Sequence, residues 1–233
     1  MATVIAAGSS AAPAALEEQV AAAMNWLRAH SSRATRDGMA RYGIPADHAL
    51  GVAMKDIKQL GGQLGRHHQL AQALWDTGVY EARMLTQFVA DPTRISAAEM
   101  DRWCKAFDNW AYCDALSFNL FDRTPQAWNM VDRWAVSRQE FVRRTAFALL
   151  WSLALHDRDA PDSAFRHGLQ LIEDAATDER HYVKKAVSMA LKAIARRTAL
   201  KTPAAALASR LAASDDLTAR WIGKDALRDF ARR

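Results

Sequence analysis

The chain has 233 residues and a formal net charge of +5, and half of its residues are apolar. This length suits one sizeable core or one elongated repeat array, and the sequence has no run of about 18 apolar residues, which excludes a membrane-spanning helix. Its two cysteines, Cys104 and Cys113, have no histidine at ligand spacing. They are therefore predicted to be small apolar fillers rather than parts of a disulfide framework or a zinc site.

The composition favours helix over strand, because alanine, leucine and arginine are abundant and glycine is sparse. Residues 1–13 form an alanine-rich stretch without the features of a secretory signal, and they are predicted to be a disordered tail. Beyond the tail, apolar residues recur at helical spacing and no convincing strand pattern is found. The predicted helices span residues 14–29, 33–42, 53–64, 67–76, 79–90, 97–107, 110–121, 125–135, 138–156, 161–175, 179–197, 203–213 and 216–231.

Capping signals mark the starts of several predicted helices. Ser137-x-x-Glu140 has the capping-box form, in which two side chains satisfy the first free N–H groups. Thr124-Pro125 places a hydroxyl before a proline at the first helical position. Asn109 is predicted to cap the helix that follows it.

Internal repeats organise the second half of the chain. The segments EFVRRTAFALLWSLA (140–154) and HYVKKAVSMALKAIA (181–195) share an aromatic-Val-basic-basic pattern, with Val142 and Val183 41 residues apart, and a looser copy occupies 217–231. A period near 40 with two helices per unit is typical of HEAT-type solenoids. The predicted fold class is therefore all-α, a curved solenoid of HEAT-like repeats with a concave basic face. It forms a single domain over residues 14–233.

Basic residues recur on the second helix of each repeat. Arg144 shares a face with apolar side chains, and Lys185 stands at the matching position of the next repeat. One interpretation is that these cations extend from the core edge into water. The other, which the repetition favours, is a basic track for a phosphate backbone. The further residues predicted to contact DNA are Lys55, Lys58, Arg83, Arg143, Lys184, Met189 and Lys192.

The segment DNWAYCDAL (108–116) places a carboxylate on the aromatic side of a helix. Trp110, Asp114 and Phe118 share one stripe, and Phe118 is expected in the core. A carboxylate there needs a partner. Asp114 could pair with Arg144, cap a neighbouring helix or lie at the mouth of a cleft. Alternatively, it could face a basic groove and stabilise a developing positive charge.

These residues carry a resemblance to a known family. Asn109-Trp110-x-x-x-Asp114, followed about 30 residues later by Arg144 in FVRRTAF, resembles the HEAT-repeat DNA alkylation repair glycosylases, the AlkD-like family. The segment GVAMKDIKQL (51–60) resembles the family's Gly-led N-terminal helix segment. The similarity extends from about residue 20 to residue 231.

The resemblance implies an enzyme that hydrolyses the N-glycosidic bond of N3- or N7-alkylated purines in duplex DNA, without a metal or another cofactor. It implies that Asp114 is the catalytic carboxylate, Trp110 a wall beside the lesion and Arg144 a backbone contact. Met189 stands where the family's pattern would place a second aromatic residue. A monomer is expected, because the end of the solenoid looks charged (RDFARR), and the expected location is cytoplasmic, associated with the bacterial nucleoid.

Two other functions stay open. The first is a non-catalytic HEAT-repeat protein that binds damaged or branched DNA, which Met189 keeps in consideration. The second is a protein-binding scaffold, a common role of such arrays, which predicts an apolar or acidic groove. The basic residues on the second helices argue against this scaffold function.

Overall fold

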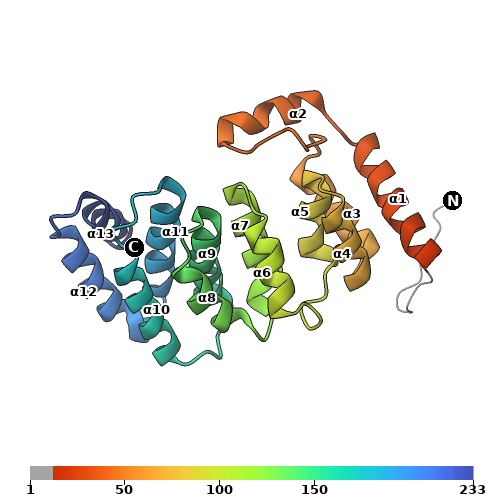
Figure 1. Ribbon diagram of the computed structural model, residues 1–233. Coiled ribbons are helices and arrows are strands. Elements are labelled where there is room, and N and C mark those ends of the chain that lie inside the picture. Colours follow the sequence, from red (N-terminus) through yellow and green to blue (C-terminus); the bar gives the residue numbers. More distant parts are fainter. Residues whose placement is uncertain (1–12, 233) are drawn as a thin grey trace. The chain divides into compact units, whose positions relative to one another are not determined.

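The computed structural model describes residues 13–232, and in this range every regular element is a helix (Figure 1). The all-α prediction is therefore confirmed. The predicted tail lies outside the described residues except for Pro13, where the first helix begins. Within the described range, no helix is both long and apolar enough to cross a membrane.

The chain divides into two compact units at Ser96 and Ala97, and each unit is described by itself. The prediction of one continuous domain over residues 14–233 stays a prediction. The helices of the first unit are α1 (Pro13–Ala29), α2 (Arg33–Gly38), α3 (Met54–Leu64), α4 (His68–Asp76) and α5 (Tyr80–Val89), with a 3₁₀ turn at Met39–Tyr42.

In the first unit, the loop before α3 is fastened to α5 by Glu81. This buried carboxylate accepts the backbone N–H groups of Leu50 (2.9 Å), Gly51 (2.7 Å) and Val52 (3.2 Å). Gly51 has a φ of +84°, and a Cβ there would lie 2.2 Å from the carbonyl oxygen of Ser32. The Gly-led segment that opens at residue 51 therefore requires a glycine for its backbone conformation and for space.

The second unit consists of helices that pack side by side along the chain (Figure 1). One row contains α7, α9, α11 and α13, each packed on the next, while α8 packs on α9, α10 on α11 and α12 on α13. The bounds are α6 (Ala97–Lys105), α7 (Trp110–Asn119), α8 (Ala127–Ala135), α9 (Glu140–His156), α10 (Asp162–Asp174), α11 (His181–Ile194), α12 (Lys201–Ala212) and α13 (Leu217–Phe230), with 3₁₀ turns at Phe121–Arg123 and Thr198–Leu200.

The repeat pattern corresponds to the packing of this row. Val142 and Val183, which define the 41-residue spacing, are both buried, at the starts of α9 and α11. Large side chains fill the interior, and burying each of them stabilises the fold by about 1.5–3 kcal/mol. The largest fully buried side chains of this unit are Trp103, Trp134, Phe121, Phe147 and Phe165.

Two predicted helix starts are wrong. The helix α9 begins at Glu140 rather than after Ser137, whose hydroxyl accepts the N–H of Gln139 at 3.1 Å in a local turn. The proline of Thr124-Pro125 lies outside α8, and the Thr124 hydroxyl donates to the carbonyl of Phe121 (2.8 Å). In both cases a short hydroxyl side chain bonds to nearby backbone in a turn instead of capping a helix.

The predicted helix over residues 33–42 is also divided in two. It breaks after Gly38, and the following 3₁₀ turn ends at Gly43 with a φ of 67°. The short α2 contains no buried residue. Because α2 has no apolar face to pack against the core, tertiary packing does not stabilise a longer helix at this position.

Candidate functional site

The start of α7 is set by Asn109, as predicted. Its backbone is extended, and its side-chain oxygen accepts the N–H groups of Ala111 (3.0 Å) and Tyr112 (3.4 Å). The residue is almost completely buried. This cap fixes Trp110 as the first residue of α7 and thereby places Asp114 one turn further along the helix.

Asp114 and Arg144 form a bidentate pair between α7 and α9. Nη2 of Arg144 donates to both carboxylate oxygens of Asp114 (2.7 and 2.9 Å), and Nε donates to Oδ1 (3.2 Å). Nη1 donates to the backbone carbonyl of Tyr182 on α11 (2.8 Å). Among the alternatives for Asp114, pairing with Arg144 is the one observed. Arg144 shares a face of its own helix with apolar side chains, and packing brings the Asp114 carboxylate of α7 against this face of α9.

The two partners differ in their access to solvent. The side chain of Arg144 is 8% exposed, whereas that of Asp114 is 23% exposed. Burial raises the pKa of Asp114 above its ordinary value, although the charge and the hydrogen bonds of Arg144 act in the opposite direction. Asp114 is thus a partly desolvated carboxylate that remains within reach of a ligand.

Two aromatic rings flank the guanidinium group of Arg144. Its central carbon lies 5.9 Å from the centre of the Trp110 ring and 5.9 Å from that of Tyr182. Phe141 supports the Tyr182 ring at 5.4 Å. Tyr182 is not among the site residues predicted from the sequence. Its signal was the aromatic-Val-basic-basic pattern, in which Phe141 and Tyr182 occupy equivalent positions.

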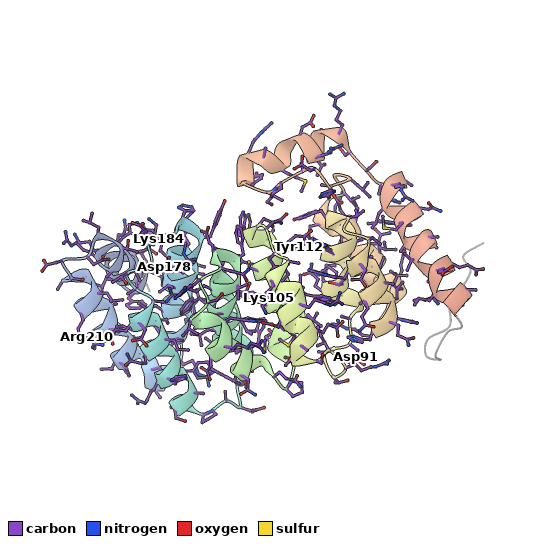
Figure 2. The ribbon with its side chains drawn as sticks, viewed as in Figure 1. Asp91, Lys105, Tyr112, Asp178, Lys184 and Arg210 are labelled. Carbon is purple, nitrogen blue, oxygen red and sulfur yellow. The ribbon has the colours of Figure 1, made fainter. Side chains whose placement is uncertain are left out.

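Next to this site, the first turns of α11 carry cations that have no carboxylate partner within residues 13–232. Lys184 lies over the Trp221 ring at 5.4 Å, and Lys185 is exposed. His181, at the start of α11, has a lowered pKa because of partial desolvation and because the positive charges of Lys185, Lys184 and Arg144 outweigh the opposing charge of Glu140. This end of α11 therefore has a positive local potential (Figure 2 labels Lys184).

Two other residues predicted to contact DNA have carboxylate partners within the second unit. Nη1 of Arg143 lies 2.9 Å from Asp178, and Nζ of Lys192 lies 2.8 Å from Asp225. Their charges are locally compensated, so they contribute less to a phosphate track than Lys184 and Lys185. Met189 is half-buried in α11.

The remaining predicted contacts belong to the first unit. Lys55 and Lys58 are exposed on α3. Arg83 is held by Trp75, since its Nε donates to the Trp75 carbonyl (3.3 Å) and its guanidinium carbon lies 4.9 Å from the ring centre. Their participation in one DNA track with the second unit stays a prediction.

The two cysteines are free and buried, as expected of apolar fillers. Burial raises the pKa of Cys113 to about 12 and that of Cys104 well above its ordinary value. A thiol this buried carries little thiolate at neutral pH, so neither cysteine suits nucleophilic chemistry. Within residues 13–232, no group of three or more His, Cys, Asp or Glu side chains is arranged to hold a metal ion.

Comparisons with known proteins relate the chain to DNA repair proteins. The family model described as "DNA alkylation repair enzyme" matches residues 23–230. No curated protein matches significantly. One similar solved structure, with a TM-score of 0.76 and 20% identity, is described as "a new family of proteins related to the HEAT-like repeat DNA glycosylases with affinity for branched DNA structures". It aligns with 91% of this chain, and the alignment covers 94% of the other chain.

Two further similar structures come from Streptococcus mutans. AlkD2 has a TM-score of 0.58, and smu.31 of strain UA159 has a TM-score of 0.57. Each is 18% identical, and each alignment covers 91% of this chain and 97% of the other. At these identities the likeness shows the fold, and the predicted HEAT-like repeat architecture is confirmed.

Proposed function

This chain belongs to the DNA alkylation repair enzyme family, and we propose that it is a glycosylase that releases N3- or N7-alkylated purines from duplex DNA. A purine alkylated at either nitrogen is already cationic. It can leave without a proton donor, so the enzyme needs no general acid of the kind used by two-carboxylate glycosidases. As the bond to the sugar lengthens, positive charge develops on the sugar, and a carboxylate nearby stabilises that charge.

The observation that carries the proposal is the environment of the Asp114 carboxylate. It is ionisable, partly exposed and held in a fixed orientation by Arg144 beside an indole ring. A preorganised charge in a partly dehydrated site stabilises a transition state more strongly than a charge in water. Asp114 would therefore stabilise the sugar cation and orient the attacking water.

Arg144 would act mainly by positioning Asp114. An arginine has five N–H donors. The two oxygens of the Asp114 carboxylate lie too close together to take separate N–H groups of Nη2, so the observed bonds to Asp114 and to the Tyr182 carbonyl use Nε–H, one N–H of Nη2 and one N–H of Nη1. One N–H on each of Nη1 and Nη2 is left for a phosphate oxygen, while the bidentate pair keeps Asp114 oriented.

Trp110 and Tyr182 would supply the aromatic walls for the cationic nucleotide. A cation over an aromatic face is stabilised by about 0.5–2 kcal/mol. Both rings stand at the same distance from Arg144. Tyr182 would therefore serve as the second aromatic residue. Met189 is less suited to this role, because a thioether is a poorer partner for a cation than an aromatic ring.

A second candidate function is favoured by the same ion pair. In the free protein Arg144 covers both oxygens of Asp114, and one similar structure is described as having affinity for branched DNA. A protein that binds branched DNA without cleavage would need only the cations and the aromatic rings. It would show salt-dependent binding and no base release.

The test is release of 3-methyladenine and 7-methylguanine from a methylated duplex, measured by chromatography. We expect release by the wild type and a loss of about 100-fold or more in Asp114→Asn, the size of effect seen when a preorganised stabilising group is removed. Asp225→Asn is the matched control, because Asp225 also pairs with a cation across the helix row.

We expect Asp225→Asn to release base at the wild-type rate. A wild type that frees no base while binding branched DNA would support the second function. Equal release by wild type and by Asp114→Asn would remove the carboxylate from the mechanism.

A further inference from the structure

Beyond the Asp114–Arg144 pair, side chains from the two sides of the seam between α7 and α9 meet at two further levels. The second level joins Phe118 to Trp151, and the third joins Asp122, just after α7, to the end of α9. Residue numbers rise together on both sides, so the two helices run parallel. The three contacts form a ladder whose rungs on the α7 side are four residues apart.

The second rung is an aromatic pair that is not completely buried. The rings of Phe118 and Trp151 lie 4.6 Å apart in an edge-to-face arrangement, and both side chains are half-buried rather than in the core. The expectation that Phe118 is a core residue is therefore corrected. One helical turn, about 5.4 Å, separates Phe118 from Asp114 along α7. That length is comparable with one to two base steps of about 3.4 Å along B-DNA.

The third rung holds a histidine at the surface. Nδ1 of His156 lies 2.6 Å from Oδ2 of Asp122, which also accepts the Ser152 hydroxyl (2.6 Å). The Asp122 side chain is 1% exposed, whereas that of His156 is 49% exposed. The other oxygen of Asp122, Oδ1, has no hydrogen-bond partner within residues 13–232, and Nε of Arg123 lies 3.9 Å from it.

This geometry orients the imidazole. With Nδ1 directed at a buried carboxylate, Nε2 points away from Asp122, and the protonated ring then offers an N–H to a ligand. Phe118 packs edge-to-face against the same imidazole at 5.7 Å. The aromatic pair and the half-exposed imidazole are thus adjacent along the seam.

We propose that Phe118, Trp151 and His156 form a subsite for an unstacked nucleotide next to the one at Asp114. The nucleobase or sugar would pack on the aromatic pair, and a phosphate oxygen would accept the Nε2–H of His156. Aromatic platforms that take exposed base faces, combined with a cation for the backbone, are the usual means of binding unpaired strands. The subsite rests on the proposed interaction with DNA, but not on catalysis.

A second histidine–aspartate pair provides a matched control. Nε2 of His167 on α10 lies 2.8 Å from Asp132 on α8, and both side chains are largely exposed. Neither residue belongs to the α7–α9 seam. Replacing His167 removes the same imidazole and the same type of hydrogen bond at a position outside the proposed subsite.

The experiment measures binding of fluorescein-labelled, undamaged DNA by anisotropy over a range of salt concentrations. The probes are a forked duplex with a single-stranded arm and a fully paired duplex of the same sequence. The variants are Phe118→Leu, Phe118→Tyr, His156→Gln and His167→Gln, each with its urea midpoint measured. Asp122 is left unchanged, because it is buried and its replacement could unfold the protein.

We expect Phe118→Leu to weaken fork binding by about fivefold or more, as for loss of one base-stacking ring, without a change in salt dependence. Phe118→Tyr retains the ring and should bind as the wild type. At a pH at which His156 is protonated, His156→Gln should weaken fork binding and lower the slope of log K against log salt by about 0.7, the loss of one single-strand phosphate contact. The paired duplex should be affected less by each change.

Wild-type fork binding by folded Phe118→Leu and His156→Gln would overturn the subsite, and so would an equal loss in His167→Gln. Because the DNA is undamaged, these outcomes are independent of base release. A wild type that frees no alkylated base but shows the expected fork pattern would end the glycosylase proposal and leave the subsite standing. A wild type that frees alkylated base but lacks the expected fork pattern would end the subsite proposal and leave the glycosylase proposal standing.

Discussion

Two seams of the same helix row contain an aspartate paired with a cation, and they differ in what surrounds the carboxylate. Between α7 and α9, Asp114 is bonded by one side chain, Arg144. Between α11 and α13, Asp225 accepts bonds from both Lys192 (2.8 Å) and Ser188 (2.7 Å). The two aspartates have similar exposed fractions, 23% and 25%.

The pKa values of the two aspartates move in opposite directions. Burial acts to raise both, but at Asp225 the hydrogen bonds from Lys192 and Ser188 and the charges of Lys192 and Arg228 outweigh it, so that pKa is lowered. At Asp114 burial prevails over Arg144 alone, and the pKa is raised. A carboxylate whose charge is compensated by several hydrogen bonds is typical of a structural role. A carboxylate whose ionised form is destabilised by burial, at a partly exposed position, is typical of a functional site.

The largest expected effect is on stability. Arg144→Met should leave the Asp114 carboxylate partly buried and unpaired, and we expect it to lower the free energy of unfolding by about 3–5 kcal/mol. Lys192→Met should cost only about 1.5 kcal/mol, because Asp225 keeps its bond from Ser188. Urea unfolding followed by circular dichroism measures both. Equal losses would show that the two seams are energetically alike.

The next effect is on pH dependence. The ordinary pKa of both aspartates is 3.8. Since the folded pKa of Asp114 is higher, its protonated form favours folding, and this contribution is lost as the pH rises from 3.8 through the folded value. The lowered pKa of Asp225 has the opposite sign, so its contribution is present above 3.8 and is lost as the pH falls through the folded value.

Unfolding titrations of Asp114→Asn and Asp225→Asn between acidic and neutral pH should therefore diverge from the wild type in opposite directions. Single-turnover base release should fall on the acid side at a midpoint above 3.8, because Asp114 must be ionised. A midpoint below 3.8 would mean that Arg144 dominates and that Asp114 resembles Asp225.

The smallest effect is on salt dependence. Lys185→Ala should reduce the slope of log K against log salt for duplex DNA by about 0.9, the loss of one phosphate contact. The control is Lys105→Ala on α6, which removes the same charge but lies in an ion pair with Asp101 (2.7 Å; labelled in Figure 2). An equal slope change in both variants would indicate a general effect of net charge rather than a track at α11.

Much of the fold could be predicted from the sequence because it depends on local patterns. The Asn109 cap and the repeat-marking valines lie within single helices or their first turns, and the structure confirms them. The stripe that carries Trp110, Asp114 and Phe118 likewise follows from helical spacing. The contacts of Asp114 with Arg144 and of Phe118 with Trp151 then follow once the two helices pack in parallel.

Other features depend on contacts between helices that no local pattern encodes. The pairing of Lys192 with Asp225 and the bond from Arg144 to the Tyr182 carbonyl each join residues more than 30 positions apart. Their formation requires the actual register of α11 against its neighbours. For the same reason, the sequence could not indicate which cations are compensated, and Arg143 and Lys192 were predicted together with Lys184 and Lys185 as equivalent contacts.

Because α7 and α9 run parallel, the number of residues along α9, as well as their types, determines which side chains of α9 face α7. Inserting one residue between Arg144 and Trp151 would rotate every later side chain of the helix by about 100°. Arg144 would keep Asp114, while Trp151 and His156 would turn away from Phe118 and Asp122. Such an insertion would therefore separate the Asp114–Arg144 pair from the proposed nucleotide subsite.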